Sequence, residues 1–161
     1  MRRHEILHAY RKDTDYLLAT TPDETFVTLF LAVLEASTGR LRYANAGHLA
    51  PLALAGAAAE EPMRLTSGGT VLGAFPGVRF EEGQADLRPG SLLALFSDGL
   101  PETMDGEGRA FHQRRLVEAL RAGWGEPAMS VLERLLRSAE AFRGHREATD
   151  DVSVILLRRL G

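Results

Sequence analysis

Apolar and polar residues recur along the chain in patterns that predict both helices and strands. Residues 3–18 place apolar side chains at helical spacing, which predicts an amphipathic helix that the polar run 13–15 could interrupt. Residues 25–35 are rich in β-branched and aromatic side chains and predict a strand buried on both faces. Residues 40–44 alternate polar with apolar, as a half-buried return strand does, so the two strands predict a hairpin.

The rest of the chain predicts short strands, then two helices, then a last strand. The expected elements are strands over 52–55, 63–65 and 79–87, helices over 111–121 and 126–142, and a strand over 152–157. Glycines punctuate the stretch from Gly68 to Gly77, which is typical of turns and does not lead into a helix start.

A run of five apolar residues over 92–96 leads directly into Ser97, Asp98 and Gly99. A short apolar run that ends in a breaker predicts a buried strand opening into a tight turn. Asp98 then lies at the mouth of a core strand, where a carboxylate is costly unless it has a use. Gly99 allows the backbone to turn sharply beside it.

A second pair of carboxylates, Asp150 and Asp151, immediately precedes the last predicted strand. Taken alone, these residues suit a strand entry made of turn formers. If the strand over 92–96 and the last strand are antiparallel neighbours, however, Asp98 and Asp150 reach the same edge of the sheet. Carboxylates that converge repel one another unless a hard cation neutralises them, and oxygen ligands favour Mg²⁺ or Mn²⁺ over Zn²⁺. The pattern therefore predicts a metal-assisted hydrolase.

Composition narrows the function classes further. The chain has 161 residues, enough for one domain with a sizeable core, and no cysteine, which excludes disulfides, zinc–thiolate sites and cysteine-nucleophile phosphatases. Neither a P-loop nor a Gly-x-Ser-x-Gly elbow is present. The net charge of -3 gives no electrostatic case for nucleic acid or an anionic membrane. With no membrane-spanning run and no signal-peptide core, we expect a cytoplasmic protein.

The tetrapeptide Asn45-Ala46-Gly47-His48 follows the predicted hairpin. Asn and Gly are typical of turns that need a positive φ, so the simple interpretation is a turn. His48 taken alone is more often a loop histidine than a catalyst.

Five short motifs occur in a fixed order along most of the chain. They are TFVTLF at 25–30, YANAGH at 43–48, LG at 72–73, FSDGLPE at 96–102 and DDVS at 150–153. In this order they resemble the SpoIIE/RsbU-like branch of the metal-dependent (2C-type) protein serine/threonine phosphatases, over about residues 25–158.

The resemblance implies an α+β fold, a β-sandwich of mainly antiparallel strands flanked by helices. It implies a phosphoserine/phosphothreonine phosphatase with two Mg²⁺ or Mn²⁺ ions, in which a metal-bridging water attacks phosphorus. Asp98 and Asp150 match the family's metal-binding aspartates, and Asp151 lies beside Asp150 as a candidate second contributor. The site-shaping positions of this branch are matched by Gly99, Asn45, Gly47, His48 and Glu102. The implied substrate is a phosphorylated bacterial regulator of the anti-anti-sigma type.

The chain departs from the family pattern at its start. The family begins with strands that carry a Gly-Asp-x-Tyr-Asp-like motif and the aspartate that bridges both metals, whereas residues 1–24 offer only a helix and a loop before the region 25–161. We therefore expect one phosphatase 2C-like domain over 1–161, incomplete at its N-terminus, and a homodimer or strand exchange that covers the open sheet edge. A second departure is Phe111-His112, where the family tends to have Phe-Gly.

Three hypotheses stay open at this point: a phosphatase whose N-terminal part lies outside this chain, a catalytically incomplete binding or regulatory module with a phosphatase fold, and a structural domain in which the aspartates merely end strands. The presence of both Asp98 and Asp150 argues against the third. Because the bridging aspartate is missing, the second hypothesis, a catalytically incomplete module, stays open.

Overall fold

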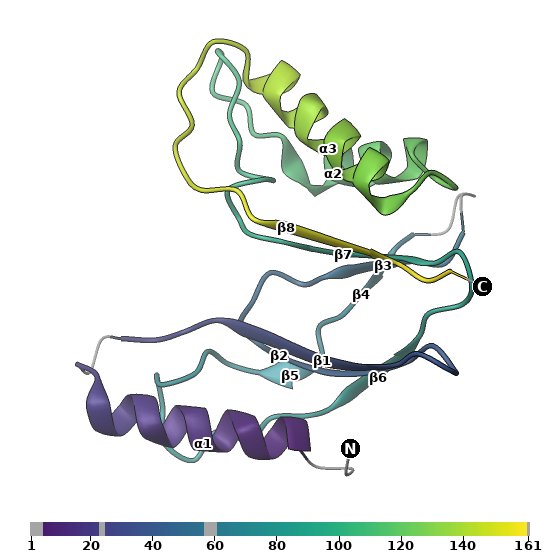
Figure 1. Ribbon diagram of the computed structural model, residues 1–161. Helices are drawn as coiled ribbons and strands as arrows, with labels where there is room; N and C mark the ends of the chain where they lie inside the picture. Colours follow the sequence, from purple (N-terminus) through teal and green to yellow (C-terminus); the bar gives the residue numbers. More distant parts are fainter. Residues whose placement is uncertain (1–4, 23–24, 57–60, 161) are drawn as a thin grey trace. The chain divides into compact units, whose positions relative to one another are not determined.

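The computed structural model describes residues 5–22, 25–56 and 61–160. The chain forms two compact units, one of residues 1–50 and 64–87 and the other of residues 51–63 and 88–161. Figure 1 labels the helices and strands of both units. The expectation that the whole chain is one domain stays a prediction.

The first unit is a helix and a sheet built on the predicted hairpin. Its elements are α1 (Glu5–Thr20), β1 (Leu29–Glu35), β2 (Arg40–Ala46), β5 (Gly68–Gly69) and β6 (Gly83–Asp86). Strands β1 and β2 are antiparallel, with a register that runs from the Leu29–Ala46 pair to the Glu35–Arg40 pair. The hairpin is therefore confirmed, while β5, which pairs in parallel with the end of β2, falls where the sequence predicts only turns.

Helix α1 is continuous through residues 13–15, so the interruption considered there does not occur. Its apolar stripe packs on the sheet, where Ile6 and Tyr10 join Ala44 and Ala46 in the buried core of the unit. The Tyr10 hydroxyl donates to the Ala44 carbonyl at 2.6 Å and accepts from the Leu31 amide at 2.8 Å. One side chain thus ties the helix to both strands of the hairpin.

The prediction that residues 25–35 are buried on both faces is wrong. Strand β1 begins only at Leu29, its side chains are half-buried, and Phe26 is 59% exposed. Its side chains are only half-buried because β1 is an edge strand, which pairs only with β2 among the described residues.

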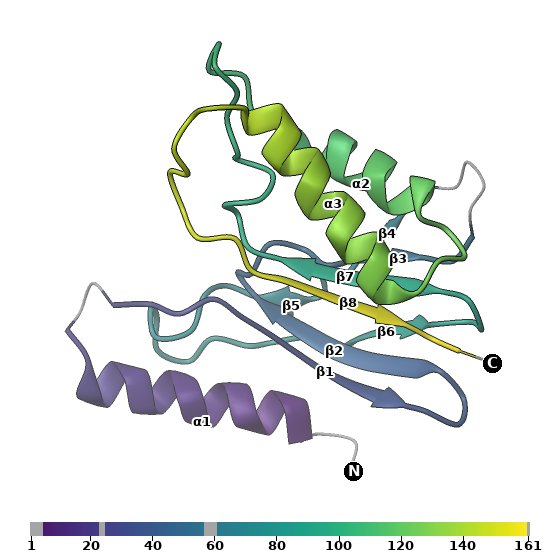
Figure 2. The same ribbon diagram turned by 45° about the horizontal axis from the view of Figure 1, so that its top comes forward.

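The second unit is a sheet with two helices on one face. Its elements are β3 (Leu52–Leu54), β7 (Leu92–Phe96), α2 (His112–Ala122), α3 (Ala128–Arg143) and β8 (Val154–Arg158), with β4 (Met63–Arg64) where the chain passes between the units. The strand order is β4-β3-β7-β8. Helices α2 and α3 lie together over the β7–β8 part of the sheet in both views (Figures 1 and 2).

The entrance to α2 has an unusual backbone. His112 has a φ of 60° and is the one residue other than glycine with a positive φ in the part of the chain that the structure describes. Its amide donates to the Pro101 carbonyl at 2.8 Å, which fixes this geometry. The position where the family tends to have glycine therefore does adopt the left-handed conformation that glycine accepts at low cost.

The architecture confirms an α+β fold with mainly antiparallel sheets flanked by helices. The β2–β5 pair is the parallel exception. The predicted helix within 1–24 is α1, and residues 23–24 of the predicted loop lie outside the described residues. Among the helices that the structure describes, none combines the length and the apolar character that crossing a membrane requires.

Candidate functional site

Asp98 lies where β7 ends in the second unit. The strand before it is apolar and largely buried, whereas the Asp98 side chain is exposed, so its charge carries no burial cost. Its Oδ1 accepts a hydrogen bond from the Gly99 amide at 3.1 Å. The tight turn predicted after residues 92–96 is therefore present.

Asp150 and Asp151 lie just before β8, and both side chains are exposed. Strands β7 and β8 are antiparallel neighbours, and their ladder ends at the pair of Phe96 and Val154. The end of β7 and the start of β8 thus share one edge of the sheet. This confirms the strand pairing from which the meeting of Asp98 and Asp150 was predicted.

Gly99 is the point at which the two acidic segments touch. A Cβ atom on Gly99 would lie 2.4 Å from the carbonyl oxygen of Asp151 and 3.5 Å from Cβ of Asp150. A separation of 2.4 Å is below any real contact between these atoms, so only glycine allows this approach.

Ser97 holds the two segments together, a role that the sequence analysis missed. Its amide donates to the Ser153 carbonyl at 2.9 Å, its Oγ accepts from the Ser153 amide at 2.9 Å, and the same hydroxyl donates to the Asp151 carbonyl at 3.2 Å. The hydroxyl thereby continues the strand ladder past its last regular pair. The available signal was a serine in each motif, Ser97 directly before Asp98 and Ser153 two residues after Asp151.

Glu102 is one helical turn beyond Asp98. The Glu102 amide donates to the Asp98 carbonyl at 3.0 Å, and the Thr103 hydroxyl donates to the Gly99 carbonyl at 2.8 Å. These bonds fix the backbone of the turn, and the Glu102 side chain is exposed. The second unit therefore presents the side chains of Asp98, Glu102, Asp150 and Asp151 to solvent.

Two arginines lie near the loop that leads to Asp150. Arg143 and Arg146 line the same small hollow as Gly99 and Asp150, which has a volume of about 10 Å³. That is room for one water molecule at most. The Arg146 guanidinium also donates to the Asp105 carbonyl at 3.1 Å, and this bond holds Arg146 beside the hollow.

Asn45, Gly47 and His48 belong to the first unit, where they build a turn at the end of β2. The buried Asn45 side chain accepts from the His48 amide at 2.8 Å and donates to the His48 and Leu65 carbonyls at 2.9 and 3.2 Å. Gly47 has a φ of 68°, and a Cβ there would lie 2.4 Å from the Val71 side chain. These contacts agree with the turn interpretation of the motif.

The acidic site contains the oxygen donors that Mg²⁺ or Mn²⁺ prefers, but not a full set of them. Over residues 5–22, 25–56 and 61–160, no three His, Cys, Asp or Glu side chains are grouped as a metal ion would require. Asp98 and Asp150 therefore do not form a complete metal site with the other described residues.

The fold is that of the PP2C phosphatase domains. The SiaA-PP2C domain of Pseudomonas aeruginosa superimposes with a TM-score of 0.81 at 19% identity, covering 94% of this chain and 60% of that one. The PP2C phosphatase domain of SpoIIE from Bacillus subtilis, solved with a fragment of its regulatory domain, gives a TM-score of 0.73 at 19% identity over 90% of this chain and 41% of that one.

The sequence places the chain within this class. The family model of Stage II sporulation protein E (SpoIIE) matches residues 2–160, and the chain belongs to that family. Protein IcfG of Synechocystis sp. is 28% identical over 159 residues, which are 96% of this chain and 24% of IcfG. The chain thus spans about a quarter of this relative and 60% of the SiaA-PP2C structure.

Proposed function

We propose that this domain hydrolyses phosphoserine or phosphothreonine on a protein substrate, in a metal-dependent reaction that uses Asp98 and Asp150. The observation that carries the proposal is the contact of Gly99 with the Asp150–Asp151 segment, which holds two acidic segments, about 50 residues apart in sequence, at one sheet edge. If these aspartates only ended strands, nothing would require the exposed pair Asp150 and Asp151 to lie against the turn after β7. Family membership supports the same reaction class.

The residues divide into ligands and supports under this proposal. Asp98 and Asp150 supply carboxylate oxygens to the metal site, and Asp151, next to Asp150 in the sequence, is a further donor. Gly99 sets the distance between the two segments, and Ser97 fixes their register through its hydroxyl. Asn45, Gly47, His48 and Glu102 shape the backbone around their own turns.

The described residues offer too few ligands for the site, so the activity needs at least one further donor. A strand added beside β8 would place that donor next to Asp150, because β8 is the terminal strand of its sheet among the described residues. We propose that a second copy of the chain can supply such a strand, which makes a homodimer. A clean monomer by light scattering at high protein concentration would contradict this part of the proposal.

The substrate we propose is a phosphorylated bacterial signalling regulator of the anti-anti-sigma type. We propose that the domain acts on it in the cytoplasm. This choice rests on the SpoIIE family and on the chain's slightly acidic composition, which gives no electrostatic case for a nucleic acid. The net charge of -3 gives no attraction to anionic membranes either.

A second candidate function is a binding or regulatory module that recognises a phosphoprotein without hydrolysing it. It is favoured by one observation, the incomplete ligand set among the described residues. The two candidates differ in turnover, since both predict binding of a phosphoprotein.

The test is phosphate release from a phosphoserine-bearing anti-anti-sigma protein in the presence of Mn²⁺. Asp98→Asn should abolish turnover, while Asp86→Asn, an exposed aspartate on β6, should leave it unchanged. Binding of the phosphoprotein with no release would favour the binding module. If the chain neither binds the phosphoprotein nor releases phosphate from it, both candidates are contradicted.

A further inference from the structure

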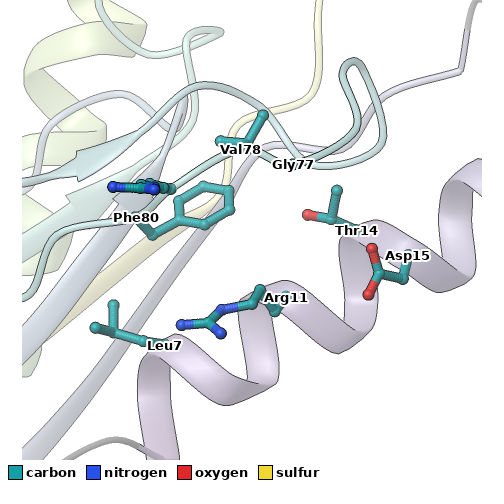
Figure 3. Close-up of a pocket in the computed structure, with 8 residues that line it drawn as sticks. Leu7, Arg11, Thr14, Asp15, Gly77, Val78 and Phe80 are labelled. Carbon is teal, nitrogen blue, oxygen red and sulfur yellow. The ribbon is translucent and has the colours of Figure 1, made fainter.

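A cavity of about 650 Å³ lies in the first unit, between α1 and the segment 77–80 (Figure 3). All the residues that line it belong to that unit, and none of them is a residue of the acidic site. Its volume falls in the range typical of sites for small molecules.

One wall of the cavity is apolar. Val78 and Phe80 of the segment 77–80 supply this wall, and Leu7 adds an apolar side chain from α1. The Phe80 ring lies 5.0 Å from the Tyr10 ring, centroid to centroid, and Phe80 is only 9% exposed. A ring held in this way offers a fixed surface for a flat apolar group.

The opposite wall, α1, carries polar groups, and one of them is buried without a hydrogen-bond partner. Thr14 is 3% exposed, and its hydroxyl has no hydrogen-bond partner. An unsatisfied buried hydroxyl is unfavourable, by about 1–3 kcal/mol in typical cases. In Figure 3 this hydroxyl and the Arg11 guanidinium point from α1 into the space that faces Phe80. A ligand group at this place would satisfy both.

Charge narrows the ligand class. Arg11 and Arg79 both line the cavity and are exposed, and neither guanidinium has an ion pair with any described residue. Asp15 is the acidic residue of the lining. Two guanidiniums and one carboxylate leave one net positive charge, which matches a monoanion.

We propose that this cavity binds a small organic carboxylate with a flat apolar body. The carboxylate lies between the guanidiniums of Arg11 and Arg79 and takes the Thr14 hydroxyl as a donor, while the body packs on Phe80. Bound in this way, the ligand bridges α1 and the chain that leads into β6. The proposal does not depend on the phosphatase reaction.

The test uses amide NMR spectra of the full 161-residue chain in EDTA, titrated with naphthoate. Shift changes should be confined to α1 and residues 77–80. Arg11→Gln and Thr14→Val should each weaken binding about tenfold, the loss expected for one charge-assisted contact or one buried hydrogen bond. Arg40→Gln, an exposed arginine outside the cavity, should leave binding unchanged.

Naphthyl methanol, with the same body and no charge, separates an anion site from a merely apolar one. Weaker binding of the alcohol by about tenfold or more supports the proposal. Equal binding of acid and alcohol, shifts that map to the second unit, or no shifts at millimolar naphthoate would each overturn it. Circular dichroism of every variant confirms that α1 is still folded, so a loss of binding reports the site itself.

Discussion

The backbone of Gly99 lies so close to the carbonyl oxygen of Asp151 that a Cβ on Gly99 would be 2.4 Å from that oxygen. This contact joins the turn after β7 to the loop before β8. Any side chain at position 99 would push the two acidic segments apart, so the approach requires glycine.

Gly99→Ala should therefore destabilise the second unit. Overpacking of this kind costs about 1–3 kcal/mol in free energy of unfolding, since the backbone of Asp151 has to move. Urea denaturation measures the change. Gly106→Ala is the matched control, because a Cβ there meets nothing within 4 Å. Equal stability of the two variants would show that the close approach is not a constraint in solution.

Ser97→Ala should loosen the loop that carries Asp151 with only a small loss of global stability, about 1 kcal/mol. The Ser153 amide loses its acceptor, so its hydrogen exchange should accelerate. Ser153→Ala keeps that amide and the Ser97 hydroxyl, and it should exchange at the wild-type rate. An unchanged exchange rate in Ser97→Ala would contradict the proposed role of the hydroxyl.

Tyr10 makes the first unit sensitive to alkaline pH. Burial raises the pKa of Tyr10 to about 12, from an ordinary value of 10.0. The folded state therefore favours the protonated hydroxyl. The resulting stability is complete below pH 10.0 and is lost as pH rises from there through about 12.

Tyr10→Phe tests this dependence. At neutral pH the variant should be less stable by about 1–3 kcal/mol, because the Leu31 amide and the Ala44 carbonyl lose their partner. Between pH 10.0 and about 12 its stability should fall less steeply than that of the wild type. Parallel pH profiles for the two proteins would argue against a raised pKa at this position.

His112→Gly should stabilise the second unit. His112 has a φ of 60°, and this conformation destabilises the folded state by roughly 1–2 kcal/mol for a residue with a Cβ. Glycine removes that cost, but the greater entropy of its unfolded chain destabilises the folded state by about 0.5–1 kcal/mol. The expected net gain is about 0.5–1 kcal/mol by thermal or urea unfolding. Gln113→Gly, one residue further into α2, should instead destabilise. Destabilisation by both substitutions would mean that His112 makes compensating contacts.

The parts of the fold that the sequence predicted share one property, a local pattern strong enough to decide the element. The β1–β2 hairpin followed from a β-rich run, a turn and an alternating run. Residues 92–96 followed from five apolar residues and a breaker. The meeting of the β7 and β8 ends was expected only on the condition that the two strands are antiparallel neighbours, and the structure meets that condition.

What the sequence did not reveal depends on contacts between residues far apart in the chain. Strand β5 is the pair Gly68–Gly69, a turn pattern that becomes a strand only because glycine can lie against the backbone of Asn45. The half-exposed state of β1 follows from its place at the sheet edge. The bonds of Ser97 depend on the register of β7 against β8, which no local pattern fixes.

The measurement that tests the central proposal most directly is calorimetric titration of the whole chain with Mn²⁺. If Asp98 and Asp150 are two ligands of a metal site, the wild type and Asp86→Asn should give saturable heat at millimolar Mn²⁺. Asp98→Asn and Asp150→Asn should give none. Absence of binding to the wild type at millimolar Mn²⁺, or the same heat from all four proteins, would contradict a metal site at the shared end of β7 and β8.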